Sequence, residues 1–248
     1  MKSKTAHIKV AAASVTGPLH STMGLACQDC YQHARGKNFV AVVSDGAGSA
    51  RYGKVGARIV CEIVCNMLKN ADFNHMRVYV TKAIATARQR LSLHRLNAGK
   101  NDENIEHFAA TVVGAVVHDN RGLFFHIGDG AAIAIYDQAC DNFVVSRPEN
   151  GRFSCETYFY TQNEWLENLR FTEFENAKNL FLMSDGLTNF SFCNDFQEID
   201  KGFIPPINDF LCNSSLKSKS ERALRNTLNT PRAQKLNSDD KTLLWVKL

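Results

Sequence analysis

The sequence has no apolar run long enough to cross a membrane. The longest, residues 109–117, is interrupted by Thr111 and Gly114 and is far shorter than the roughly 20 residues that a membrane helix needs. The basic N-terminal segment MKSKTAH is not followed by the sustained apolar stretch of a secretory signal. We therefore expect a cytoplasmic protein that does not bind membranes.

A strong excess of charge of one sign is also missing. The net charge is +4, with 29 Lys and Arg against 25 Asp and Glu. The local basic excess in residues 217–235 is interspersed with Ser and Asn rather than with aromatic residues. This pattern is not typical of nucleic-acid binding. It predicts a solvated helix or loop, with docking of an acidic or phosphorylated partner as the alternative.

The eight cysteines lack a clear disulfide or metal-binding pattern. Cys27 and Cys30 have the spacing of a zinc or redox motif. Cys61 and Cys65, however, are four residues apart in a helix-like segment, where thiols serve as small apolar fillers. Scattered cysteines of this kind fit a reducing compartment.

Several catalytic motifs are absent. The sequence has no Gly-x-Ser-x-Gly elbow, no Walker phosphate-binding loop and no His-Glu-x-x-His pair. Composition leaves a pair of glycosidase acids open, but such a pair would not explain the Asp-Gly corners described next.

What the sequence does contain is an aspartate at one end of four strand-like segments. Three apolar segments run into Asp-Gly, and an Asp-Asp pair precedes the last strand. One such corner usually marks a plain turn, but four of them spread along the chain predict one acidic cluster within a single domain, residues 1–248. The four positions are Asp45, Asp129, Asp185 and Asp239.

Apolar periodicity predicts the remaining elements. A four-residue repeat predicts helices over 53–70 and 75–97. Apolar runs bounded by turns predict further strands, with a hairpin turn at 119–122. Helices between early and middle strands indicate an α+β layered fold. The further strands are expected at 8–15, 108–118, 123–127, 131–137 and 143–145.

Two segments are harder to interpret. Residues 147–174 are rich in aromatic side chains, which predicts a packed subregion, with a partner surface as the alternative. Residues 189–237 are expected to be helix and loop, interrupted at Pro205 and Pro206.

The acidic corners favour a hard cation. Carboxylate oxygens, with backbone carbonyls exposed by adjacent glycines, suit Mg²⁺ or Mn²⁺ better than zinc. Carboxylates held together would repel one another unless a cation neutralised them. Two ions roughly 3.5–4 Å apart can share a water, lower its pKa and clamp a phosphoryl group.

These motifs resemble a known family. VSDGAG at 43–48, IGDG at 127–130, LMSDG at 182–186 and DDKT at 239–242 resemble, in order and approximate spacing, the metal-dependent serine/threonine protein phosphatases of type 2C. The element from His20 to Asp29 resembles the bacterial branch of that family. The resemblance implies a four-layer α/β/β/α sandwich of two antiparallel β-sheets flanked by helices.

The resemblance also implies a centre with two Mn²⁺ or Mg²⁺ ions at one edge of the sandwich. Asp45 would bridge both ions, and the carbonyl of Gly46 would contact the second. Asp185 and Asp239 would complete the shell of the first ion. Asp129 matches an acid of the family that helps to hold a third, looser ion.

The remaining site residues include departures from the family pattern. Asp29 would orient waters in the outer shell. Gln28 stands where many members place a glutamate, and the phosphate-binding arginine expected near Gly24 is missing. His20 is the candidate to fill such a gap, as phosphate ligand or general acid, with a structural histidine as the alternative. Two smaller departures are Ala47, where some members carry a histidine, and Gly130, which replaces a serine.

The resemblance implies a hydrolase of bacterial signalling that dephosphorylates phosphoserine and phosphothreonine by direct attack of a metal-bridging water. The expected partner is a phosphorylated protein, a cognate Ser/Thr kinase or its target, and the chain is expected to be a monomer. One alternative is a catalytically weak, phosphatase-like module that binds phosphorylated partners. Another is a dinuclear hydrolase of small phosphate esters.

Overall fold

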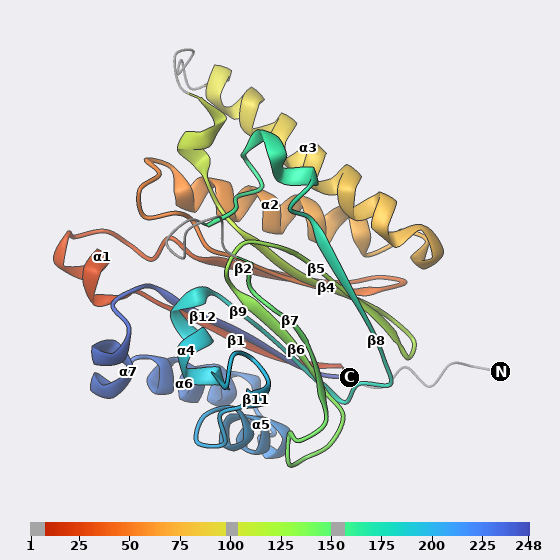
Figure 1. Ribbon diagram of the computed structural model, residues 1–248, viewed down its shortest axis with the longest axis vertical. Coiled ribbons are helices and arrows are strands. Elements are labelled where there is room, and N and C mark those ends of the chain that lie inside the picture. Colours follow the sequence, from red (N-terminus) through yellow and green to blue (C-terminus); the bar gives the residue numbers. More distant parts are fainter. Residues whose placement is uncertain (1–7, 98–103, 150–156) are drawn as a thin grey trace.

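Two five-stranded antiparallel sheets pack face to face in the computed structural model, which describes residues 8–97, 104–149 and 157–248 (Figure 1). One sheet has the order β1-β12-β9-β6-β7 and the other β2-β3-β4-β5-β8. The strands are β1 (Lys9–Val15), β2 (Cys30–Arg35), β3 (Phe39–Ser44), β4 (Val112–His118), β5 (Arg121–Ile127), β6 (Ala131–Ile135), β7 (Phe143–Ser146), β8 (Arg170–Glu175), β9 (Asn179–Met183), β10 (Phe192–Cys193), β11 (Glu198–Ile199) and β12 (Lys241–Lys247).

Helices cover both outer faces of the sandwich. In Figure 1, α2 and α3 lie over the sheet that contains β3 and β4, and α5 and α6 lie over the other sheet. The predicted four-layer α/β/β/α sandwich is confirmed. The helices are α1 (Pro18–Thr22), α2 (Gly53–Leu68), α3 (Met76–Asn97), α4 (Thr188–Ser191), α5 (Ile204–Asn213), α6 (Lys217–Leu228) and α7 (Pro231–Leu236), and the short 3-10 turns are η1 (Phe73–His75), η2 (Ile105–Phe108), η3 (Asn163–Leu166) and η4 (Asp185–Leu187).

Small side chains let the two sheets approach each other. The layer between them combines Phe, Leu and Val side chains with alanines, among them Ala41, Ala115 and Ala132, all fully buried. A second core lies between the sheet that contains β3 and β4 and the helices α2 and α3. Cys61 and Cys65 of α2 are packed within it. Their predicted role as apolar fillers is confirmed.

Most elements lie where apolar periodicity predicts them, but β4 begins later. Both long helices and the hairpin between β4 and β5 are confirmed, with Asp119 at φ 52° in the turn. Residues 105–108 form η2 instead of the start of a strand, because Asn104 caps that turn by accepting a hydrogen bond from the Glu106 amide. The predicted loop at 97–106 falls largely outside the described residues.

The segment 147–174 ends within the edge strand β8, which its aromatic composition did not predict. Tyr160 is fully buried, in agreement with the predicted core packing, whereas Phe153 lies outside the described residues. Pro205 and Pro206 do not interrupt a helix, since they occupy the first turn of α5. A proline costs no hydrogen bond in that turn, because the amides there have no partner within the helix.

No helix within residues 8–97, 104–149 and 157–248 has both the length and the apolar character needed to span a bilayer.

The layer between the sheets is expected to supply much of the stability. Leu182 of β9 is fully buried there, and Leu93 of α3 is 53% exposed. Leu182→Ala should lower the free energy of unfolding by about 2–5 kcal/mol, since it removes buried methyl groups and leaves a cavity. The matched control Leu93→Ala should change it by less than about 0.5 kcal/mol. Urea denaturation measures both, and equal effects would contradict this account of the core.

Candidate metal centre

Loops from both sheets meet at one end of the sandwich. β3 and β5 both pair antiparallel with β4, so they run in the same direction and end at the same edge. β12 pairs antiparallel with β9, so it begins where β9 ends. The four predicted aspartates therefore come together and line one cavity of about 600 Å³: Asp45, Asp129, Asp185 and Asp239.

Hydrogen bonds to Thr111 fix the backbone at Asp45. The Thr111 amide donates to the Asp45 carbonyl at 2.8 Å, and the Thr111 hydroxyl accepts from the Asp45 amide at 3.0 Å. The next residue, Gly46, passes so close to the start of α2 that an added Cβ would lie 2.4 Å from the carbonyl carbon of Gly53. Only glycine permits this close approach.

Burial and mutual repulsion make the cluster costly when all its members are ionised. Burial raises the pKa of Asp45 well above its ordinary value, and the charges of Asp29 and Asp185 raise it further. Burial raises the pKa of Asp185 to about 7, with the charge of Asp129 as the next cause. The carboxyl groups of Asp45 and Asp185 are direct neighbours, and each affects the pKa of the other. Buried carboxyls this close disfavour simultaneous ionisation unless a cation neutralises them.

The donor set of this cavity fits a hard divalent cation. The four side chains offer only oxygen, and a buried oxygen of Asp185, Oδ1, has no hydrogen-bond partner. An unpaired buried carboxylate oxygen is unfavourable in protein alone and is satisfied by a cation. In the described part of the chain, no three acidic, histidine or cysteine side chains converge closely enough to hold an ion as they stand. The carboxylates surround the cavity rather than meet at one point.

Asp29 lies behind the cavity rather than on its wall. It is 6% exposed, and its Oδ2 accepts a hydrogen bond from the Ser184 hydroxyl at 2.8 Å. Burial raises its pKa to about 6. This carboxyl borders Asp45 from the protein side, which is the arrangement that an outer-shell role requires.

Asp129 has a different environment from the other three. Its Oδ2 accepts a hydrogen bond from the hydroxyl of Thr157. Burial raises its pKa. The contact holds Asp129 at the side of the cavity formed by the segment 157–162.

His20 lies outside the cavity, in contact with an aspartate that the sequence analysis did not distinguish. Its Nδ1 is 2.9 Å from Oδ2 of Asp240, although the angle is too poor for a hydrogen bond. Only 4% of His20 and none of Asp240 is exposed. Its Nε2 faces Gly48 of the cavity wall, where an added Cβ would lie 3.2 Å away.

Asp240 binds both ends of the segment that carries His20. Its Oδ1 accepts a hydrogen bond from the Gly17 amide at 2.8 Å, and its Oδ2 accepts one from the Gln28 amide at 2.5 Å. The Gln28 side chain turns away from the cavity, accepting from the Lys54 amide and donating to the Ala26 carbonyl. Gln28 is not among the residues that line the cavity.

The sequence analysis also missed a buried cation beneath the acids. Lys241 is fully buried, and its Nζ donates to the carbonyls of Asn237 and Asp239, each at 2.7 Å. Burial lowers its pKa, and the neighbouring aspartates oppose that effect. The motif DDKT does not predict that Lys241 is buried, because the direction of its side chain depends on how the preceding turn folds.

The segment 157–162 forms the wall of the cavity next to Asp129. Its side chains line the cavity beside those of residues 47–49. Arg88 of α3 fixes this wall, donating to the carbonyls of Tyr160 and Gln162 at 2.6 and 2.7 Å. Aromatic composition alone did not mark these residues as part of the site. The lining residues of the segment are Thr157, Tyr158, Phe159 and Gln162.

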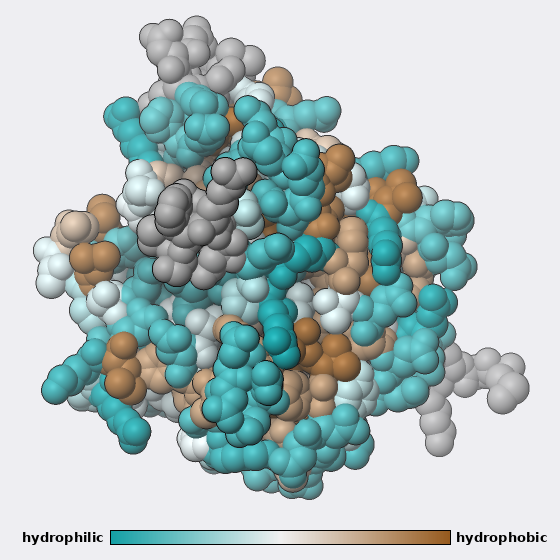
Figure 2. Space-filling view, in the orientation of Figure 1, coloured by the Kyte–Doolittle hydropathy of each residue, from teal (hydrophilic) through white to brown (hydrophobic). Residues whose placement is uncertain are grey.

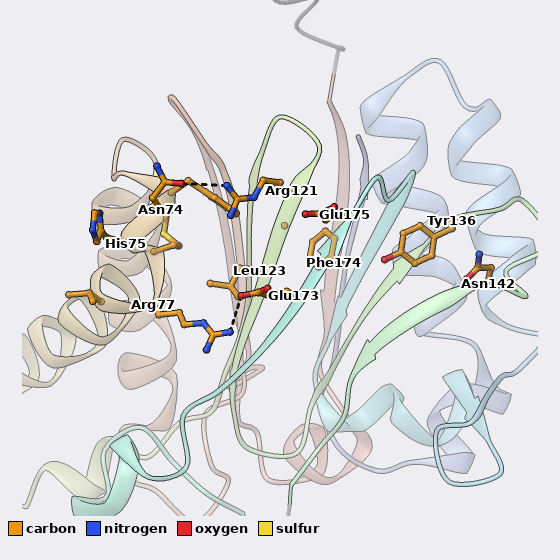
Figure 3. Close-up of a pocket in the computed structure, with 14 residues that line it drawn as sticks. Asn74, His75, Arg77, Arg121, Leu123, Tyr136, Asn142, Glu173, Phe174 and Glu175 are labelled. Carbon is orange, nitrogen blue, oxygen red and sulfur yellow. Dashed lines mark hydrogen bonds and ion pairs between the residues drawn. The ribbon is translucent and has the colours of Figure 1, made fainter.

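A larger cavity, of about 750 Å³, lies at the opposite end of the sandwich between the start of α3 and strands β5 and β8 (Figure 3). Both arginines that line it have side-chain partners. Arg77 binds Glu173 at 2.9 Å, and Arg121 donates to Asn74 at 3.4 Å. None of the predicted site residues lines this cavity.

The raised pKa values predict how the metal-free protein responds to pH. Asp29 and Asp185 titrate near pH 6 and 7 when folded, against 3.8 when unfolded. Between pH 4 and 7 the folded state therefore holds more protons, so its stability falls as pH rises through this range. Urea denaturation in chelator should show a loss of a few kcal/mol from pH 4.5 to 8.

Two comparisons make this prediction specific. Asp185→Asn should reduce the pH dependence, leaving the contribution of Asp29, and added Mn²⁺ should restore stability at pH 8. The control Asp119→Asn, in the exposed hairpin turn, should leave the dependence unchanged. A metal-free protein that gains stability over this range would contradict the analysis.

Known structures share this architecture at low sequence identity. The catalytic domain of the serine threonine protein phosphatase PstP, in complex with two manganese ions, superposes with a TM-score of 0.65 at 15% identity over 97% of each chain. The serine/threonine phosphatase Stp1 from Staphylococcus aureus gives 0.65 at 14% identity, covering 98% of this chain and 96% of Stp1. PppA of Pseudomonas aeruginosa, a regulatory component of a type VI secretion system, gives 0.69 at 14% identity over 98% of each chain.

At these identities the structural matches establish the fold. No curated protein sequence matches this chain. The family itself is established by sequence, because the pattern of protein phosphatase 2C matches residues 16–229, and this range includes three of the four aspartates that line the cavity. The chain belongs to the protein phosphatase 2C family.

Proposed function

We propose that this chain is a metal-dependent phosphoprotein phosphatase that hydrolyses phosphoserine and phosphothreonine. One observation carries the proposal: aspartates from four separate segments and both sheets line a single cavity at one end of the sandwich. Family membership makes this cavity the expected place of the reaction. We further propose that the chain acts as a monomer with one domain spanning residues 1–248.

The carboxylates would hold two Mn²⁺ or Mg²⁺ ions. Asp45 and Asp185, already in contact, are proposed as the first ligands, with Asp239 beside them and the Gly46 carbonyl next in the chain. Asp129, held by Thr157, is proposed to serve a third ion. The manganese ions of the PstP structure are consistent with this choice of metal. When bound, such ions supply Lewis acidity toward phosphoryl oxygens and lower the pKa of water.

The protein's own groups set the conditions for that chemistry. Asp29, fixed by Ser184, is proposed to accept hydrogen bonds from water beside Asp45. Lys241 balances part of the negative charge from below, and its bonds to the carbonyls of Asn237 and Asp239 fix the turn that presents Asp239. The segment 157–162 faces the carboxylates and is proposed to contact the substrate around its phosphoryl group.

The contacts of His20 support a positioning role. Its buried ring lies between Asp240, 2.9 Å from Nδ1, and the cavity loop at Gly48, which Nε2 faces. The role that the sequence suggests, phosphate ligand or general acid, remains a prediction. A positioning residue and a general acid differ in which substrates are affected when the residue is replaced, and this difference can be measured.

Asp185 provides the direct test of the proposed function. Asp185→Asn should reduce Mn²⁺-dependent phosphate release from phosphoserine peptides by at least about a hundredfold, because it removes a ligand charge. Electron paramagnetic resonance of bound Mn²⁺ should show weaker binding. The control Asp119→Asn should match the unaltered protein in both measurements.

Three outcomes would exclude the proposal. Phosphopeptide binding without phosphate release would support the binding module instead. Rapid hydrolysis of small phosphate esters beside slow hydrolysis of phosphopeptides would support a metabolite hydrolase. Full activity in chelator would exclude a metal-dependent reaction.

A second test concerns His20. If it positions the loop through Asp240, His20→Gln should lower kcat by a similar factor, about tenfold, for substrates with good and with poor leaving groups. A general acid would instead be needed mainly for the poor leaving group. A loss confined to poor leaving groups, with a shift in the pH profile, would assign His20 as the acid.

A further inference from the structure

The segment from Thr16 to Gln28 is unusual in a chain that is 22% charged. It contains no Asp, Glu, Lys or Arg, and three of its large apolar side chains are exposed: Leu19 by 48%, Met23 by 64% and Leu25 by 46%. Met23 is the most exposed large apolar residue among those the structure describes. We call these three residues the apolar rim. Figure 2 shows brown surface at the left edge, where Figure 1 places α1.

The apolar rim is held in place although its side chains face solvent. The Leu19 amide donates to the Ser238 carbonyl at 3.1 Å, and the Met23 and Leu25 amides both donate to the His20 carbonyl. Asp240 binds the segment at Gly17, His20 and Gln28, as described above. Exposed apolar groups on a fixed backbone lose little further freedom when they bind a partner, which favours association.

The apolar rim borders the cavity of the acidic residues. Ser238, which anchors Leu19, directly precedes Asp239 in the chain. His20, the neighbour of Leu19, faces the cavity wall at Gly48. A peptide that places a phosphorylated residue in the cavity and leaves it on the side of Gly48 and Asp239 crosses the edge of the molecule near this segment. Extended chain spans about 3.3–3.6 Å per residue, so residues up to four positions away can reach side chains roughly 13 Å from the phosphoryl group.

We propose that Leu19, Met23 and Leu25 form a docking surface for the protein substrate, which binds apolar side chains that lie within about four residues of the phosphoserine or phosphothreonine. This inference rests on the proposed function and specifies its substrate class. The segment that carries the rim adjoins two parts of the cavity wall, Asp239 through the Leu19–Ser238 hydrogen bond and Gly48 through His20, which argues for the substrate rather than for another occupant. The absence of Lys and Arg from the segment removes the attraction that an anionic membrane surface or an acidic partner would need.

The test measures binding separately from turnover. Peptides carrying a non-hydrolysable phosphonate analogue of phosphoserine, equal in charge and differing by Leu or Ser at positions two to four residues away, are titrated with the Mn²⁺-loaded protein by fluorescence anisotropy. The unaltered protein should bind the Leu peptides about tenfold more tightly, as expected for burial of one or two aliphatic groups. The variant with Leu19→Ser, Met23→Ser and Leu25→Ser should lose this preference.

Two controls establish that the loss is local. Val78→Ser changes a side chain that is 52% exposed at the opposite cavity, and this variant should keep the preference. Phosphate release from a small aryl phosphate should be unchanged in the triple variant, and so should its thermal unfolding, because the substituted side chains are exposed.

Several results would overturn the inference. These are equal binding of Leu and Ser peptides by the unaltered protein, or a preference that survives in the triple variant. A dimer of the unaltered protein that the triple variant abolishes in light scattering would assign the rim to a second copy of the chain. Binding to phosphatidylglycerol vesicles that the triple variant loses would assign it to a membrane. Absence of aryl phosphate hydrolysis would contradict the proposed function alone, since the binding titration does not depend on turnover.

Discussion

Repulsion between buried carboxylates is the constraint on which this protein depends. Asp45 and Asp185 touch, Asp29 lies directly behind them, and burial opposes ionisation of all three. Contacts between residues close in the chain would not hold these repelling carboxyls together. Here hydrogen bonds with Thr111 fix the backbone at Asp45, and a hydrogen bond from Ser184 fixes the carboxyl of Asp29. Packing of the two sheets supplies the remaining stability. A divalent cation relieves the repulsion, so the same arrangement that destabilises the metal-free protein favours binding of the metal.

The site and the core are interdependent, because each sheet contributes half of the acids. Asp45 and Asp129 follow strands of one sheet, and Asp185 and Asp239 adjoin strands of the other. The carboxylates share a cavity only when the two inner faces are packed together. The buried alanines between the sheets allow that close packing. A loss of packing between the sheets would therefore separate the four aspartates.

Asp240 links the cavity to the surface around it. One carboxylate binds two backbone amides and pairs with His20, and all of these belong to the segment 17–28. Asp239, its neighbour in the chain, faces the cavity instead. The two adjacent aspartates thus have different roles: one is proposed to bind metal, and the other fixes an uncharged loop that carries exposed apolar side chains beside the mouth. The turn at Asp239 and Asp240 thus joins the cavity wall to the exposed segment 17–28.

The sequence by itself determined the acidic corners, both long helices, the hairpin at Asp119 and the layered fold, because each depends on local chemistry. An Asp-Gly pair after an apolar run predicts a strand end, and a four-residue apolar repeat predicts a helix. Both patterns can be recognised from neighbouring residues alone. Only the tertiary structure decided the roles of Asp240, His20 and Lys241, the edge strand β8 and the wall formed by residues 157–162. Lys241 bonds to the turn just before it, but the others depend on partners distant in the chain, such as Gly17 for Asp240 or Arg88 for Gln162. A side chain's partner across more than 70 residues is set by how the sheets pack, and no local pattern records it.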